Sequence, residues 1–196
     1  MSCLKRCGLY ALPFAMLLLV LAGPARAEET GHAYIGSKKC KKCHLKQHKS
    51  WATTKMSNAY DLLKPGARAE ARTKAGLDPD KDYTADAKCL PCHTTGYGKP
   101  GGFVDMEKTP YLAGVGCEMC HGAGGTYVAD AHMSTKNKTF KKADLVPLGL
   151  VDVVSKDQCV VCHNTDSPFV GDDYVFDFEK RKAQGTHEHF KLKYDH

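Results

Sequence analysis

The sequence has no apolar run long enough to cross a membrane. Its longest apolar segment, Leu9–Ala22, is shorter than the ~20 residues that a spanning helix requires. Basic residues precede this segment and the small residues of Ala25–Ala27 follow it, which is the pattern of a cleavable secretory signal peptide. We therefore expect residues 1–27 to be removed and residues 28–196 to act in the periplasm rather than in the extracellular space.

Spare cysteine is also absent. The chain has 10 cysteines, and signal cleavage would remove Cys3 and Cys7. All the others fall into C-x-x-C pairs, so none remains to form the disulfides that exported proteins commonly use. A disulfide-stapled scaffold is thereby excluded, and the cysteine pairs themselves become the candidate sites.

Each cysteine pair is followed directly by a histidine. The C-x-x-C-H motifs, called motifs 1 to 4 in chain order, are Cys40–His44, Cys89–His93, Cys117–His121 and Cys159–His163. This is the attachment signature of c-type haem, in which two thiols add to the haem vinyl groups and the adjacent imidazole binds the iron. The predicted attachment thiols are Cys40, Cys43, Cys89, Cys92, Cys117, Cys120, Cys159 and Cys162. The predicted proximal iron ligands are His44, His93, His121 and His163.

A zinc ribbon is the alternative interpretation of paired C-x-x-C motifs. A ribbon does not require a histidine directly after the second cysteine, and chance supplies one at only roughly a few per cent of positions. Because the histidine follows every pair, the sequence predicts four covalently bound haem c groups.

A glycine-rich turn follows motif 3 and leads to His132. Glycine has no Cβ, so this turn allows the backbone to pass close to a flat cofactor. His132 then lies within reach of a second iron, and one short segment could hold one haem covalently and bind a neighbouring iron.

The expected fold is mainly α with extensive loops. Residues 28–196 would form a single tetrahaem cytochrome c domain, with short helices wrapped around four stacked haems and little or no sheet. Apolar periodicity and breaker residues predict helices over Leu45–Leu63, Ala67–Ala75 and, apart from Gly185, Phe178–Phe190.

The charge balance gives no sign of nucleic acid binding. The formal net charge of +6 falls to +3 on signal cleavage, and each ferric haem with two propionates adds about −1. A lysine cluster nonetheless surrounds motif 1 and forms either a solvated face or a docking surface for an acidic redox partner. Its members are Lys38, Lys39, Lys41, Lys42, Lys46 and Lys49.

Short segments along nearly the whole chain resemble the tetrahaem cytochrome c-554 family. They are Lys38-Lys39-Cys40, Ser50-Trp51, Leu63-Lys64-Pro65, Leu77-Asp78-Pro79, Lys81-Asp82-Tyr83-Thr84, Gly114-Val115-Gly116-Cys117-Glu118, Ser167-Pro168-Phe169 and His187-Glu188-His189. The resemblance implies a mostly helical fold, haems in closely stacked pairs and an unequal set of distal iron ligands.

The resemblance also implies which histidines complete two of the haems. His132 would bind the first haem iron opposite His44, and His187 would bind the third opposite His121. His189 is the alternative distal ligand of the third haem.

The second haem, on His93, would have no protein ligand on its far face. By the family pattern that face would be lined by Ser167, Pro168 and Phe169. An open iron can bind a small ligand such as nitric oxide, although a phenylalanine pressed on this face would oppose binding sterically.

One position departs from the family pattern. Met56 stands where the family has the histidine that completes the fourth haem. A thioether is a soft iron ligand, and His/Met ligation raises the reduction potential, so we hypothesise that Met56 binds opposite His163; otherwise it only packs on the ring. We expect His48 to be a packing or surface residue, and His32 and His196 to be free in the tails.

The leading hypothesis is an exported electron carrier that exchanges single electrons with redox protein partners along its haems. The alternatives are a small-ligand redox enzyme at an open iron on His93 and a subunit of an extracellular haem wire. We expect no transmembrane segment, and either a monomer or a weak dimer.

Overall fold

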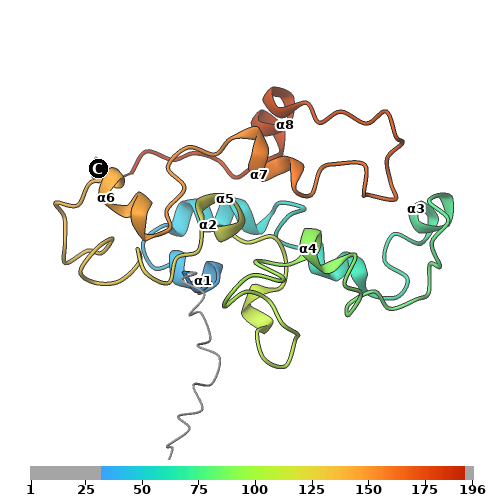
Figure 1. The fold of residues 1–196 in the computed structure, drawn as a ribbon, viewed down its shortest axis with the longest axis horizontal. Helices are drawn as coiled ribbons and strands as arrows, with labels where there is room; N and C mark the ends of the chain where they lie inside the picture. The colour runs from blue at the N-terminus through green and yellow to red at the C-terminus, as the bar shows by residue number, and fades with distance from the viewer. Residues whose placement is uncertain (1–31, 193–196) are drawn as a thin grey trace, which may run out of the picture.

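The computed structural model describes residues 32–192, which form an elongated arrangement of short helices and long loops (Figure 1). The expected signal peptide, residues 1–27, and His196 lie outside the described residues. Within them, every helix is too short or too polar to cross a bilayer.

The chain forms α-helices and 3₁₀-helices of between one and three turns. In order they are α1 (Ser37–Cys40), α2 (Leu45–Ala52), η1 (Ala59–Leu63), α3 (Ala69–Lys74), α4 (Leu90–His93), η2 (Pro110–Leu112), α5 (Glu118–His121), α6 (Lys142–Leu145), η3 (Val146–Leu148), α7 (Lys156–Val160) and α8 (Phe178–Gly185). Residues 32–192 contain no β-strand and one isolated antiparallel β-bridge, between Thr94 and Ala113. The expectation of short helices and loops with little or no sheet is confirmed.

The prediction of one continuous helix over Leu45–Leu63 is wrong. Helix α2 ends at Ala52, and the chain becomes helical again only in η1. The hydroxyl of Thr53 donates to the carbonyl of Ser50 at 2.8 Å, and that of Thr54 donates to the carbonyl of Trp51 at 2.7 Å. Such local side-chain bonds compete with the helical hydrogen bonds of the next turn, so the polar segment after α2 ends the helix.

The other two expected helices exist with different bounds. Helix α3 lies inside the expected range Ala67–Ala75 and begins after Arg68, whose φ of 53° is left-handed. Helix α8 begins at Phe178 as expected, after Asp177 accepts a hydrogen bond from the Lys180 N–H at 3.1 Å. It ends at Gly185, so the prediction of helix beyond that residue, as far as Phe190, is wrong.

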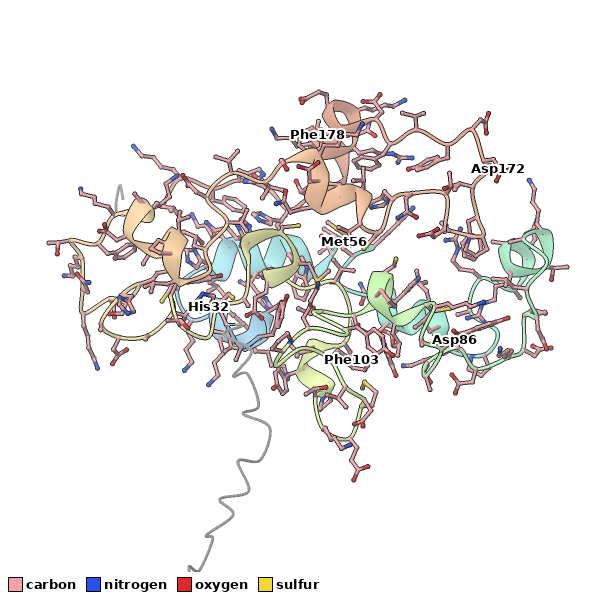
Figure 2. All side chains as sticks on the ribbon, viewed as in Figure 1. His32, Met56, Asp86, Phe103, Asp172 and Phe178 are labelled. Carbon is pink, nitrogen blue, oxygen red and sulfur yellow. The ribbon has the colours of Figure 1, made fainter. Side chains whose placement is uncertain are left out.

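A core of aromatic and leucine side chains packs around motif 2. Its buried members are Tyr60, Leu63, Tyr83, Leu90, Phe103 and Leu112. The rings of Tyr60 and Phe103 have centroids 5.6 Å apart, and Phe103 lies below α4 in the view of Figure 2. Because Leu90 belongs to both this core and motif 2, the core fixes the position of that motif.

Close backbone approach, rather than a side-chain core, organises the chain around motif 3. Gly122 has a φ of +81°, and a Cβ at this residue would collide with the carbonyl oxygen of Gly149. The Val151 N–H donates to the His121 carbonyl at 3.0 Å. The glycine after motif 3 therefore admits another backbone segment, where the sequence suggested room for a cofactor.

Candidate functional site

The C-x-x-C-H motifs fold into the same short helical turn. In motifs 1, 3 and 4 the histidine N–H donates to the carbonyl of the first cysteine at 2.9 Å. In all four motifs the N–H of the second cysteine donates to that carbonyl at 3.2 Å. This turn brings residues three and four apart to one side of a helix, so each motif presents two thiols and an imidazole together.

These thiols fit thioether attachment of haem. All the described cysteines are free, so none is engaged in a disulfide. A zinc ribbon would gather several thiolates at one point, but no group of three or more His, Cys, Asp or Glu side chains in residues 32–192 is arranged to hold a metal ion. Each motif therefore offers two thiols and one imidazole, the groups that c-type haem attachment uses.

Thiols from different motifs meet in pairs. The side chains of Cys40 and Cys117 are hydrogen-bonded to each other, which lowers the pKa of the Cys117 thiol to about 6. Cys92 and Cys162 form the equivalent pair, and that bond lowers the pKa of the Cys92 thiol to about 7. Motif 1 therefore lies against motif 3, and motif 2 against motif 4.

A third contact joins the two pairs. Helix α5 of motif 3 packs against α7 of motif 4, and the two helices lie next to each other in Figure 1. Burial, followed by the neighbouring Cys159, raises the pKa of the Cys120 thiol to about 11. The spatial order of the motifs is therefore 1, 3, 4 and 2, which differs from their order in the chain.

His93 is oriented as an iron ligand would need to be. Its Nδ1 lies 2.6 Å from the carbonyl oxygen of Ala59 in η1. This contact leaves Nε2 available, and metal-binding histidines commonly use such a bond to fix their orientation. Burial lowers the pKa of the imidazole, which favours the neutral form that binds metals.

His121 and His187 come together although they are far apart in the sequence. Their ring centroids are 6.2 Å apart, and two imidazoles that bind one metal from opposite sides at about 2 Å each have centroids about 6 Å apart. The Nδ1 of His187 lies 2.8 Å from the Glu188 carbonyl oxygen, which leaves its Nε2 available. The ring centroid of His189 lies 4.8 Å from that of His187, but His189 is more exposed than His187. The choice of His187 as distal ligand stays a prediction, now with a matching distance.

The predicted pairing of His44 with His132 is less defined. His132 is half-buried, and its backbone N–H donates to the Ala129 carbonyl at 2.9 Å. His44 belongs to the turn of motif 1 and is also half-buried. The pairing stays a prediction.

Met56 lies near the centre of the molecule in the view of Figure 2. It is half-buried, and its carbonyl accepts the Val115 N–H at 2.9 Å. The ring of His163 stacks on Phe176, with centroids 4.8 Å apart and planes 22° apart. Ligation of the fourth haem iron by Met56 stays a prediction, whereas Phe176 is a neighbour of His163 that sequence reasoning missed.

The predicted lining of the second haem, residues 167–169, is a mostly exposed loop. The guanidinium of Arg68 lies 5.5 Å from the centroid of the Phe169 ring, and Phe169 is 44% exposed. Arg68 directly precedes α3, so the loop reaches the side of the molecule that carries motif 2. Its role at the open face stays a prediction.

Two other histidines can be compared with their expected roles. His48 makes an edge contact with Trp51, with centroids 5.2 Å apart, as expected of a packing residue. His32 was expected to be free in the tail, and this is wrong. Its Nδ1 lies 2.8 Å from the hydroxyl oxygen of Thr126, because the segment before α1 lies beside the segment that follows motif 3.

Sequence reasoning also missed two buried charged residues near the motifs, Glu118 and Arg72. Glu118 could have been noticed because it stands between the cysteines of motif 3. Nothing in the sequence distinguishes Arg72 from the other basic residues around it. The lysine cluster, by contrast, is exposed at all of its members, as a solvated face or a docking surface requires.

Comparisons with known proteins place these features in a family context. A family model described as "Cytochrome c554 and c-prime" matches residues 39–122. The chain is 35% identical to cytochrome c-554 of Nitrosomonas europaea over 98% of its own length and 89% of that protein. It also matches the solved structure of reduced cytochrome c554 from Nitrosomonas europaea, with a TM-score of 0.72, over 83% of this chain and 88% of that one.

Proposed function

The chain belongs to the cytochrome c-554 family, and from this premise we propose that it carries electrons between redox proteins along four covalently bound haem c groups. Haem supplies a reversible one-electron site when it is bound. The protein contributes attachment, iron ligands, burial and nearby charge, which together set how readily each site accepts an electron.

The observation that carries this proposal is the contact between thiols of different motifs. The Cys40–Cys117 and Cys92–Cys162 contacts join the motifs in two pairs. The packing of α5 on α7 joins the pairs. Groups attached at these thiols would form one continuous row, and a row is useful for passing electrons from one end of a molecule to the other.

We assign the residues of the row as follows. The eight thiols of the motifs hold the haems, and His44, His93, His121 and His163 bind the irons on one side. His132, His187 and Met56 bind on the other side of the first, third and fourth haems. The Ala59 and Glu188 carbonyls hold His93 and His187 in orientations that suit this role.

We further propose an exported, periplasmic protein in which residues 28–196 are one domain. The exposed lysine cluster around motif 1 is the proposed docking surface for a partner with acidic residues. Such steering raises association rates at low ionic strength and weakens as salt is added.

The test of carrier function is complete and rapid oxidation of the reduced holoprotein. Stopped-flow mixing with a small anionic iron complex should remove one electron from each of the four haems. The rate should fall with ionic strength if the anion approaches the lysine cluster. A haem that never reoxidises would contradict a continuous row.

The second candidate function, small-ligand chemistry at His93, is favoured by the exposure of Phe169. Electron paramagnetic resonance of the oxidised holoprotein decides whether it has a site. A high-spin ferric signal from one haem in four indicates an open iron and supports a side activity. Low-spin signals from all four show that every iron is capped, which leaves the carrier function alone.

A further inference from the structure

The two buried charged side chains of the described residues have opposite signs. Arg72 and Glu118 are each 3% exposed. They lie in different parts of the chain, Arg72 in α3 and Glu118 at the start of α5. Removing a charge from water has a large cost unless hydrogen bonds compensate for it, so the surroundings of each side chain are informative.

The Glu118 carboxylate is satisfied entirely by backbone N–H groups. It accepts from Gly36 and Gly124 at 2.7 Å each, and from Ile35 at 3.0 Å. In its ionised form a carboxylate accepts hydrogen bonds and donates none, which matches a site made of donors. Since all these partners are neutral, the negative charge is held in place without being neutralised.

Glu118 lies where motifs 1 and 3 meet. It is part of motif 3, and its partners Ile35 and Gly36 directly precede α1, which ends in the first cysteine of motif 1. The Cys117 N–H donates to the Ser37 hydroxyl at 3.2 Å at the same junction. After burial, the charge of Glu118 is the next cause that raises the pKa of Tyr34, so its field extends to neighbouring groups.

The Arg72 guanidinium is satisfied in the complementary way, by backbone carbonyls. It donates to Leu62 at 2.6 Å and to Lys64 at 2.9 Å, and also to Pro79 at 3.0 Å and Lys81 at 3.3 Å. The ring of Tyr83 lies 4.9 Å from the guanidinium carbon, where a cation is stabilised by the aromatic face. This positive charge is likewise fixed but not neutralised.

Arg72 is linked to motif 2 by a single 3₁₀-helix, η1. It holds the C-terminal end of η1 through Leu62, while Ala59 at the start of η1 contacts Nδ1 of His93. Arg72 and the predicted proximal ligand His93 are therefore hydrogen-bonded to opposite ends of the same short helix.

A fixed charge changes the free energy of adding an electron nearby. A negative charge opposes reduction and a positive charge favours it, and the effect is larger where solvent screening is weak. The lysine cluster around motif 1 opposes the effect of Glu118, but its members are exposed and screened by water and salt. The buried charges should therefore dominate.

We propose that Glu118 lowers the reduction potentials of the haems at motifs 1 and 3, and that Arg72 raises the reduction potential of the haem at motif 2. This inference rests on the proposed haem row. It gives the row a direction, because an electron then moves downhill in free energy from the Glu118 end to the Arg72 end. No bond is made or broken and no proton is required.

The test is a potentiometric titration of the holoprotein, followed by visible absorption and resolved into four one-electron midpoints. Glu118→Gln removes the charge at nearly constant size and should raise two midpoints. Glu107→Gln removes an exposed carboxylate and should leave all four unchanged. If Glu118→Gln moves no midpoint, or moves all four by the same amount, the proposal is overturned.

Arg72→Met removes the positive charge and should lower one midpoint that Glu118→Gln leaves in place. Arg72→Lys keeps the charge but loses the fork of donors, so it should retain that midpoint while the thermal unfolding temperature falls. Lys74→Met, an exposed change on the same helix, is the control. If Arg72→Met lowers no midpoint, or if Arg72→Lys lowers the same midpoint by an equal amount, the positive charge does not set that potential and the proposal is overturned.

The wild-type protein offers a test that needs no variant to fold. The spread between the highest and lowest midpoints should stay nearly constant from low to high salt, because buried charges are weakly screened. A spread that collapses with salt assigns it to surface charge and overturns the proposal. Failure of electron exchange with the iron complex would instead contradict the carrier function and leave these midpoints measurable.

Discussion

The surroundings of motif 2 and those of the other three motifs are built in different ways. Motif 2 is fixed by a cluster of six buried side chains, to which η1, α4 and η2 all contribute. Outside this cluster the large buried apolar side chains are few in the described part of the chain. They are Tyr127, Leu145 and Phe176.

The difference shows where protein alone supplies the core and where it cannot. Around motif 2 the apolar interior comes from side chains, which stabilise by roughly 25 cal/mol for each Å² removed from water. Around motifs 1, 3 and 4 the chain supplies hydrogen-bonded turns and close backbone contacts, but little apolar area. We infer that bound haem provides the interior there, so that cofactor attachment and folding are coupled.

The largest expected effect is that of leaving the haems out. In a chain produced without haem attachment, α5, α7 and α8 should exchange their amide hydrogens freely, because few buried apolar side chains lie around them. Amides of η1 and η2 should keep partial protection, although a region of this size with one small core is marginal on its own. Hydrogen exchange measured by mass spectrometry compares the two regions directly.

The holoprotein is the control, and both regions should be protected in it. Equal protection of the two regions in the haem-free chain would contradict the comparison. It would mean that the turns around motifs 3 and 4 are stable without an apolar interior.

The next largest effect concerns the side-chain core itself. Leu112 is 1% exposed at the end of η2, and Leu112→Ala should lower the free energy of unfolding by about 2–5 kcal/mol. Val153→Ala, at a residue that is 77% exposed, should leave it nearly unchanged. Denaturant unfolding of the two holoproteins measures the difference, and similar midpoints would show that the cluster is not a stabilising core.

The motifs and the broad architecture could be predicted because they depend on local spacing and length. The C-x-x-C-H pattern identifies its own chemistry, and few residues per haem exclude an extensive sheet. The end of α2 could not be predicted from periodicity, because Thr53 and Thr54 bond back to the backbone although the apolar pattern continues.

Long-range placement accounts for the rest of what the sequence could not reveal. The contact of His32 with Thr126 and the burial of Arg72 depend on segments that meet only in the folded chain. The approach of His187 to His121 was suggested by resemblance to a family, and no pattern within the sequence predicted the distance. Tertiary contacts of this kind leave no local signal.

A smaller effect is expected where the segments next to motifs 1 and 3 are joined. The indole N–H of Trp51 in α2 donates to the carbonyl of Val115 at 3.0 Å, just before motif 3. Trp51→Phe removes this bond and should lower the free energy of unfolding by about 1 kcal/mol. Trp51→Ala should lower it further through lost packing on His48, and an unchanged stability in both variants would show that this link is not used.

The smallest effect separates an exposed charge from a buried one within the same region. The Lys64 ammonium lies 2.6 Å from the Asp61 carboxylate, but the two side chains are 58% and 59% exposed. Pairs of this kind are screened by solvent and contribute little, so Lys64→Gln should leave the thermal unfolding temperature unchanged. Arg72, whose guanidinium binds the Lys64 carbonyl, should be sensitive to any replacement that removes its donors. A clear loss of stability in Lys64→Gln would mean that surface charge, and not the fixed buried charge, holds η1 against motif 2.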